Sequence, residues 1–200
     1  MILFSEEGFS STTIRAIAKK AEVTPQTIYG IFGSKNGLVT ELVGYANEKS
    51  GTNELSKQIQ VATTAFEMIQ MSVHLVCVLH ERIGRFVLEM SHAAEFDESI
   101  KGDVNSGRSS HMTIRNLRSA RLEKSGFLLE GLDVETATGL LAVAVTPEII
   151  QSFVAGQGWG YERIEDQLTK AVLRMLCKPG TEHLPLAELN HDDFNKLSRS

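Results

Sequence analysis

The chain has 200 residues, of which 42% are hydrophobic and 22% charged, a composition that is ordinary for globular proteins and excludes a disordered chain. Its net charge of −5 excludes a protein that attracts nucleic acid over its whole surface, so any such attraction must be local. We expect no membrane association, because no run of about 18 apolar residues predicts a transmembrane helix and the acidic Glu6 and Glu7 are not typical of a signal peptide.

Residues 9 to 35 predict two short helices joined by a tight turn. Thr13 is expected to cap the first helix. Apolar side chains follow at helical spacing, at Ile14, Ile17, Ala18 and Ala21. Thr24 offers a second N-cap, and Pro25 occupies the first helical position, where its missing N–H costs nothing.

The second of these helices is amphipathic in a way that suits a groove. Val23, Ile28 and Ile31 are expected to supply the apolar contact with the first helix, and the small Ala18 stands where the two helices must cross closely. At about 100° per residue, the opposite face carries Gln26, Thr27 and Gly30. The pattern predicts a helix-turn-helix, whose second helix enters the major groove of DNA.

The next segments predict further helices. Ser34 is expected to cap a helix that runs to about Lys49, and residues 51–53 mark a break. The apolar-periodic segment from about residue 54 to 92 is expected to be two helices interrupted near His80 to Gly84.

The second half of the chain predicts a polar loop followed by helices, with the loop at 95–107 and the helices at about 109–125, 134–156 and 161–177. Asp133 is expected to cap the second of these helices, and Pro147 to kink or divide it. Residues 181–200 predict a polar tail or a surface arm. Because no strand pattern is evident, the predicted fold class is all-α.

Charge is distributed unevenly along the chain. Residues 8–40 carry four basic side chains, Arg15, Lys19, Lys20 and Lys35, against Glu22 alone, a balance of +3. From residue 51 onward there are 15 basic and 20 acidic residues, a balance of −5. The acidic part repels DNA and leaves the N-terminal part as the surface that can dock.

The N-terminal fifth of the chain resembles the DNA-binding domain of TetR-family transcriptional regulators. The matching positions are Gly8, Phe9, Thr13, Ile14, Arg15, Ile17, Ala18, Ala21, Glu22, Val23, Thr24, Thr27, Ile28, Tyr29, Phe32, Ser34, Lys35 and Leu38. The resemblance implies an all-helical homodimer that releases DNA when a small molecule binds. It implies a helix-turn-helix domain at 1–48, a larger helical ligand-binding and dimerisation domain at 49–178, and a polar tail at 179–200.

Two positions depart from the family pattern. Glu22 stands in the inter-helix turn where the family usually has glycine, and residues 1–7 match only the last turns of the family's first helix, so that helix looks truncated. These departures leave a second hypothesis open, a helical small-molecule-binding dimer with impaired or lost DNA binding.

Seven residues are expected to contact double-stranded DNA: Thr13, Arg15, Thr24, Gln26, Thr27, Tyr29 and Lys35. A carboxamide can pair with adenine N6 and N7, so Gln26 is the leading candidate for reading a base. The resemblance places Tyr29 and Lys35 on phosphates. Arg15 could instead be a solvated surface charge, and Tyr29 could serve mainly in packing.

The resemblance also implies a pocket for an unidentified small apolar effector among the middle helices. Methionine and phenylalanine suit adaptable apolar cavities, and the candidates are Phe66, Met68, Met71, Phe86, Met90 and Phe127. Core packing is the competing explanation for each of them.

The last two predicted helices are the candidates for a homodimer interface. The apolar positions assigned to it are Leu140, Val143, Ile164, Leu168, Val172 and Met175. A four-helix bundle between two copies would bury both helices. The alternative is that they are buried in the core of one subunit.

No enzyme, metal or cofactor signature is evident, so we expect a regulator that is not an enzyme. His74, Cys77 and Glu81 share a helical face but lack further ligands for a metal site. Cys77 and Cys177 lie far apart, which favours reduced thiols and a cytoplasmic protein. Four arginines, Arg108, Arg115, Arg118 and Arg121, could anchor an anionic ligand, although a solvated helix face is the simpler explanation.

Overall fold

The computed structural model describes residues 2–49, 51–96, 101, 112 and 115–189. In these residues the chain is helical, with two isolated β-bridges. Of the predicted loop at 95–107, residues 95 and 96 are the end of a helix, residue 101 is described, and the rest lies outside the described residues. Of the predicted tail at 179–200, residues 190–200 lie outside them.

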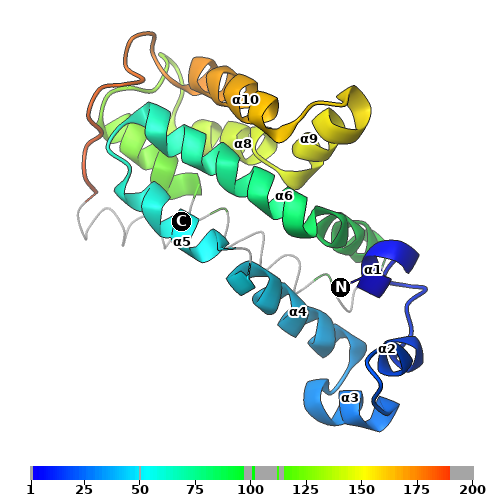
Figure 1. Ribbon diagram of the computed structural model, residues 1–200. Coiled ribbons are helices and arrows are strands. Elements are labelled where there is room, and N and C mark those ends of the chain that lie inside the picture. Colours follow the sequence, from blue (N-terminus) through cyan, green and yellow to red (C-terminus); the bar gives the residue numbers. More distant parts are fainter. Residues whose placement is uncertain (1, 50, 97–100, 102–111, 113–114, 190–200) are drawn as a thin grey trace.

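Four helices form the N-terminal part, which we call the head: α1 (Ile2–Glu7), α2 (Ile14–Lys20), α3 (Pro25–Phe32) and α4 (Lys35–Lys49). The remaining described helices form the body: α5 (Thr52–Val61), α6 (Ala65–Phe96), a helix over 115–124, α8 (Val134–Ala144), α9 (Pro147–Gln151), the π-helix η1 (Ser152–Gly156) and α10 (Tyr161–Leu176). The head projects from one end of the body, with α2 and α3 farthest from it (Figure 1).

The helix ends in the head follow the sequence signals. Ser34 Oγ accepts the Gly37 N–H at 3.0 Å, as expected of a cap. The break after α4 lies where it was predicted, at Gly51, which has a φ of +69°.

The long segment of the body divides at a different place from the one predicted. Helix α6 continues through His80 and Gly84, and the break lies at 62–64. At that break Thr64 Oγ1 accepts the Glu67 N–H at 3.1 Å, while the Glu67 carboxylate accepts the Thr63 N–H at 2.7 Å. This reciprocal capping starts α6, and it lowers the pKa of Glu67.

The segment Val134–Gly156 divides at Thr146 and Pro147, as predicted. Thr146 Oγ1 accepts the Ile149 N–H at 3.3 Å and starts α9. Among the described residues this stretch is long and apolar enough to span a membrane, by length and composition alone. In the structure it is folded back into the body, with α8 against α10 and α9 against α6.

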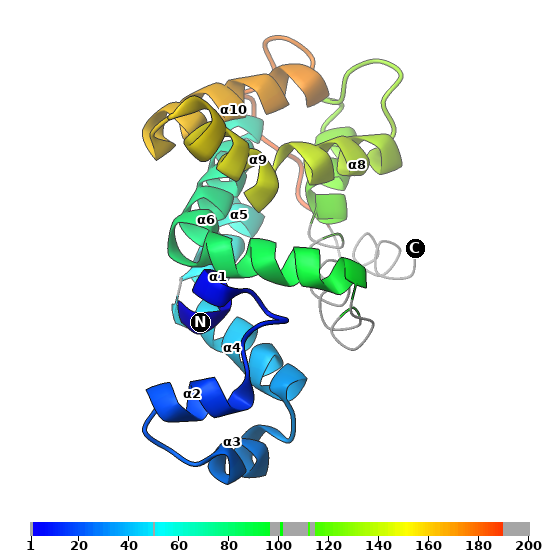
Figure 2. The same cartoon turned by 90° about the vertical axis from the view of Figure 1, so that its right-hand side faces the viewer.

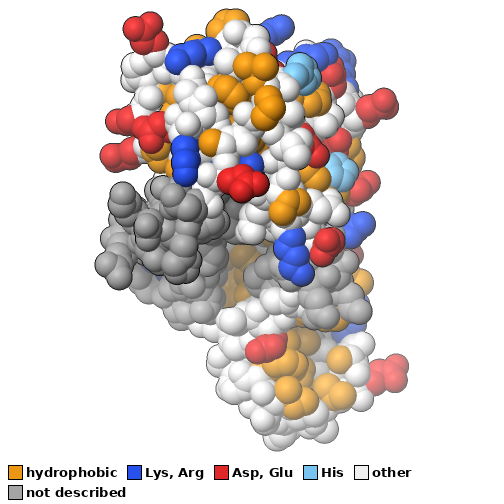
Figure 3. All heavy atoms as spheres, turned by 90° about the vertical axis from the view of Figure 1, so that its left-hand side faces the viewer, with side chains coloured by type: hydrophobic (Ala, Val, Ile, Leu, Met, Phe, Trp, Pro, Cys, Tyr) orange, Lys and Arg blue, Asp and Glu red, His pale blue; other side chains and the backbone are white. Residues whose placement is uncertain are grey.

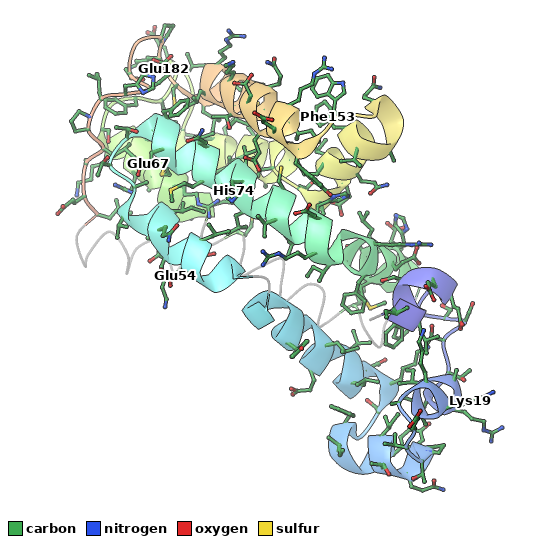
Figure 4. All side chains as sticks on the ribbon, viewed as in Figure 1. Lys19, Glu54, Glu67, His74, Phe153 and Glu182 are labelled. Atoms are coloured by element: carbon green, nitrogen blue, oxygen red, sulfur yellow. The ribbon has the colours of Figure 1, made fainter. Side chains whose placement is uncertain are left out.

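The beginning of the C-terminal segment packs as an arm. The Phe66 N–H donates to the Glu182 carbonyl at 2.7 Å, and the Leu186 N–H donates to the Thr63 carbonyl at 2.8 Å. Leu186 is buried. The arm therefore covers the start of α6, close to the end where Glu67 and Glu182 lie (Figure 4).

Helix α1 joins the head to the body, and it lies beside α6 in both ribbon views (Figures 1 and 2). The Phe4 ring stacks on Phe9 at 5.9 Å and meets Phe86 of α6 at 6.1 Å, measured between ring centroids. Val39, Met90 and Ala94 complete this buried cluster, which we call the head–body cluster.

Candidate nucleic-acid interface

The two predicted caps position α2 and α3. Thr13 Oγ1 accepts the Ala16 N–H at 3.1 Å, and Thr24 Oγ1 accepts the Thr27 N–H at 3.2 Å. The Thr24 hydroxyl also lies 3.0 Å from the Thr27 hydroxyl. Each threonine leaves the N-terminus of its helix in solvent, where backbone N–H groups favour a phosphate.

A small core holds α3 across α2. It consists of Ile14, Ala18, Ile28 and Leu38, all buried. The apolar contact was predicted to include Val23 and Ile31, and this is wrong: their side chains are 42% and 69% exposed. Leu38 of α4 is the fourth residue of this core instead, so α4 packs against the helix-turn-helix.

The polar face of α3 points into solvent. Gln26 and Thr27 are exposed, and Tyr29 is 52% exposed. Because Ile28 is buried between them, the helix cannot rotate to hide this face without losing its core. Arg15, Lys19 and Lys20 of α2 are also exposed, and Lys19 points away from the body (Figure 4).

Lys35 has structural partners in addition to its expected place on a phosphate. Its ammonium donates to the Phe9 carbonyl and lies 4.0 Å from the centroid of the Phe9 ring. A cation over an aromatic face is attracted by the ring quadrupole. Lys35 therefore ties the start of α4 to the segment between α1 and α2.

Apolar side chains gather on one face of the head (Figure 3). A shallow hollow lies there between α3 and α4, lined by Ile31, Phe32, Gly37, Thr40 and Glu41. The exposed Ile31 lies at the C-terminal end of α3, away from the N-terminus that Thr24 caps.

The inter-helix turn contains the one described non-glycine residue with a positive φ, Glu22 at +55°. The left-handed conformation costs about 1 kcal/mol for a residue with a Cβ, and the exposed carboxylate would repel a nearby phosphate.

We predict that Glu22→Gly and Glu22→Gln both raise affinity for duplex DNA, measured by gel shift at low salt. Only Glu22→Gly relieves the strain, so only it should raise the free energy of unfolding, by at most about 1 kcal/mol. Unchanged affinity in both variants would place the turn away from DNA.

The six residues expected to line an effector pocket are divided between two places. Phe86 and Met90 belong to the head–body cluster. Met68 and Phe127 are buried in the main core of the body, with Phe66 and Met71 packed against it. The Phe66 ring contacts the His183 ring of the arm at 4.9 Å between centroids.

The six residues expected at a dimer interface are divided by their burial. Ile164, Leu168 and Val172 are buried in the core of a single chain, which is the alternative considered for this helix. Leu140 and Met175 are half-buried, and Val143 is 70% exposed. Of these six residues, a second copy can therefore contact Leu140, Val143 and Met175.

Sequence patterns did not reveal the polar contacts among α6, α9 and α10. His80 is buried, with Nδ1 3.0 Å from the Tyr161 hydroxyl and Nε2 2.7 Å from Gln151 Oε1. His74 Nδ1 lies 2.8 Å from Glu165 Oε1. Burial raises the pKa of Cys77 to about 12, so this thiol is a poor metal ligand.

Comparison with known proteins agrees with this geometry. Residues 1–42 match the family described as "Bacterial regulatory proteins, tetR family". These residues belong to the TetR family. TetR-family proteins are transcriptional regulators and not enzymes.

Relatives and solved structures extend the likeness beyond the N-terminal part to most of the chain. A probable HTH-type transcriptional regulator of Bacillus subtilis, YttP, is 30% identical over 91 residues, which are 44% of each chain. Another regulator of that organism, YdeS, is 24% identical over 144 residues, 70% of this chain and 68% of YdeS. The chain thus spans from less than half to about two thirds of these relatives.

Two solved structures share the fold at low identity. NalD, a repressor of a multidrug efflux pump in Pseudomonas aeruginosa, has a TM-score of 0.73 and 19% identity, and the match covers 89% of this chain and 91% of NalD. FadR of Bacillus subtilis, solved in complex with stearoyl-CoA, has a TM-score of 0.70 and 17% identity, covering 87% and 94%. The all-α TetR architecture, with an N-terminal helix-turn-helix and a helical C-terminal part, is therefore that of this chain.

Proposed function

We propose that the protein is a cytoplasmic, ligand-responsive repressor that binds operator DNA as a homodimer and leaves it when a small effector binds in the body. The observation that carries this proposal is the exposed polar face of α3, held outward by the buried Ile28. Gln26 would read a base, while Arg15, Tyr29 and the N-termini of α2 and α3 would meet phosphates. Thr13, Thr24 and Thr27 would act mainly through those capped N-termini.

Two copies are needed because one head carries few positive charges. A symmetric dimer would place its two α3 helices about 34–36 Å apart, one turn of duplex. We propose that α8 and α10, which pack on each other, meet the same helices of a second copy through Val143, Leu140 and Met175.

Replacement of Val143 by glutamate tests that interface. A carboxylate buried without a partner costs several kcal/mol, so Val143→Glu should raise the dimer dissociation constant at least roughly a hundredfold, measured by analytical ultracentrifugation. Val61→Glu is the matched control, since Val61 is 75% exposed on α5 and should leave the dimer intact. A dimer unaffected by Val143→Glu would place the interface elsewhere.

An effector can release DNA only if it binds one arrangement of the heads more tightly than the other. Structures of similar fold were solved with stearoyl-CoA or with choline, which supports the proposal that this protein binds a small molecule. Helix α6 is the candidate for transmission, because it runs from the body core to the head–body cluster.

A gel shift with the DNA upstream of the protein's own gene, over a salt series, tests the proposal. The repressor should bind that DNA specifically, and its affinity should fall steeply with salt. Absence of binding even at low salt would instead support the small-molecule-binding dimer without DNA recognition.

A further inference from the structure

The arginines of the helix over 115–124 are held very differently from one another. Arg121 donates to three carbonyls, those of Gln60 at 3.0 Å, Ala62 at 2.8 Å and Ala187 at 3.3 Å. It thereby clamps α5 and the C-terminal arm to this helix. All three nitrogen atoms of this guanidinium donate to carbonyls, so Arg121 has a structural role.

Arg115 is half-satisfied. Its Nη2 donates to the Val145 carbonyl, at the end of α8, at 3.1 Å. Burial lowers the pKa of Arg115, and the nearby Glu148 carboxylate opposes that shift. Within the described residues this guanidinium therefore has one acceptor, the Val145 carbonyl, and one opposite charge, Glu148.

Arg118 has neither an acceptor nor an opposite charge among the described residues. Its Nε–H is shielded from solvent and, in the part of the chain that the structure describes, donates no hydrogen bond. Burial, and then the charge of Arg115, lower the pKa of Arg118 to about 10. Since that value is still well above neutral pH, the guanidinium, which is partly buried, stays charged.

Two hydroxyls on this helix and on α8, the helices that Arg115 and the Val145 carbonyl connect, are also unsatisfied. Ser119 Oγ follows Arg118 on the same helix, and Thr138 Oγ1 belongs to α8, the next described helix; both are buried without a partner among the described residues. Buried polar groups in native proteins are almost always paired, so such a group requires an explanation. A buried charge without a partner is costlier still.

We propose that Arg118, assisted by Arg115, binds the carboxylate of an amphipathic effector whose apolar part lies against the core residues Leu122 and Leu141. This inference rests on the proposed function and specifies the chemical class of its ligand. A planar carboxylate fits the two-pronged edge of a guanidinium, and Ser119 and Thr138 offer further hydrogen bonds. The surrounding core is apolar, which suits the remainder of the molecule.

The position of the site couples it to the rest of the body. Arg115 bonds the last turn of α8 immediately before α9 begins at Pro147, and α9 packs on α6. A carboxylate that draws Arg115 away from the Val145 carbonyl would disturb this junction. Because Arg118 Nε is closed to solvent in this structure, neighbouring side chains must move for the ligand to enter.

The test uses matched ligands and the full chain. Butanoate, octanoate, dodecanoate and hexadecanoate are each compared with the primary alcohol of the same length by isothermal titration calorimetry. At one or more lengths the carboxylate should bind at least roughly tenfold more tightly. In Arg118→Met the ratio of the association constants of carboxylate and alcohol should fall to about one. Arg85→Met, which changes an exposed arginine of α6, should retain the wild-type ratio.

Stability supplies an independent readout. Arg118→Met removes a partly buried charge that has no partner among the described residues, so the ligand-free variant should unfold at the same temperature as the wild type or at a higher one. A marked decrease would mean that the guanidinium is already satisfied, and would overturn the proposal. Arg118→Lys keeps the positive charge but lacks the two parallel N–H donors of a guanidinium. Its carboxylate-to-alcohol ratio should therefore lie between those of the wild type and Arg118→Met.

Two further outcomes would contradict the inference. One is a carboxylate-to-alcohol ratio near one at every length, and the other is tighter binding of octyl phosphate than of octanoate. Gel shifts on the same preparation separate the two proposals: specific DNA binding without carboxylate preference refutes the site alone, whereas carboxylate preference without DNA binding refutes the repressor.

Discussion

Replacing Ala18 by leucine should greatly weaken specific DNA binding while leaving the body folded. Ala18 is 1% exposed and lies in the small core between α2 and α3. The added carbons have no space, and overpacking of this kind costs roughly 1–3 kcal/mol or pushes α3 out of place. A loss of about 1.4 kcal/mol in each head would reduce the affinity of a two-headed dimer about a hundredfold. Gel shift with operator DNA and circular dichroism measure the two effects.

Ala21→Leu is the control for this substitution. Ala21 ends the same helix but is exposed, so a larger side chain there should be tolerated. Equal losses of affinity in the two variants would mean that crowding between α2 and α3 is not the cause.

Replacing Phe4 by alanine should be the most destabilising change in the head. Phe4 is 1% exposed and contacts both Phe9 and Phe86. Truncating a buried phenylalanine costs roughly 3–5 kcal/mol, a large share of the stability of an ordinary domain. Urea denaturation should show this loss in the free energy of unfolding.

The same variant tests how the head is connected to the body. If Phe4 links α1 to α6, the remaining native protein should bind operator DNA but respond less to an effector. Ile2→Ala, at a position 60% exposed on the same helix, should change neither property. A loss below about 1 kcal/mol in Phe4→Ala would contradict the packing described for the head–body cluster.

Local signals located the helices of the head well. Thr13, Thr24, Pro25 and Ser34 each act on the chain within three residues of themselves, so the sequence is sufficient to place them. The break before α6 had such a signal too, because Thr64 and Glu67 stand at the spacing of a capping box. The apolar periodicity that runs past it, together with Gly84, favoured the wrong break.

Longer-range contacts could not be predicted in this way. Periodicity shows that a face of α10 is apolar but not what covers it, and Ile164, Leu168 and Val172 are covered by their own chain. Phe86 and Met90 suit a pocket by composition, yet the fold places them against α1. The unsatisfied state of Arg118 depends on helices that are distant in sequence, so no local pattern reports it.

Base preference in randomised duplexes tests the central claim, that α3 reads DNA from two copies at once. Selection with the wild type should yield a palindrome whose half-sites lie about one helical turn apart. Gln26→Ala should lose preference at one A·T pair in each half-site, whereas Arg15→Ala should weaken all sequences alike. Unchanged preference at every position in Gln26→Ala, or a selected site without two-fold symmetry, would contradict the account.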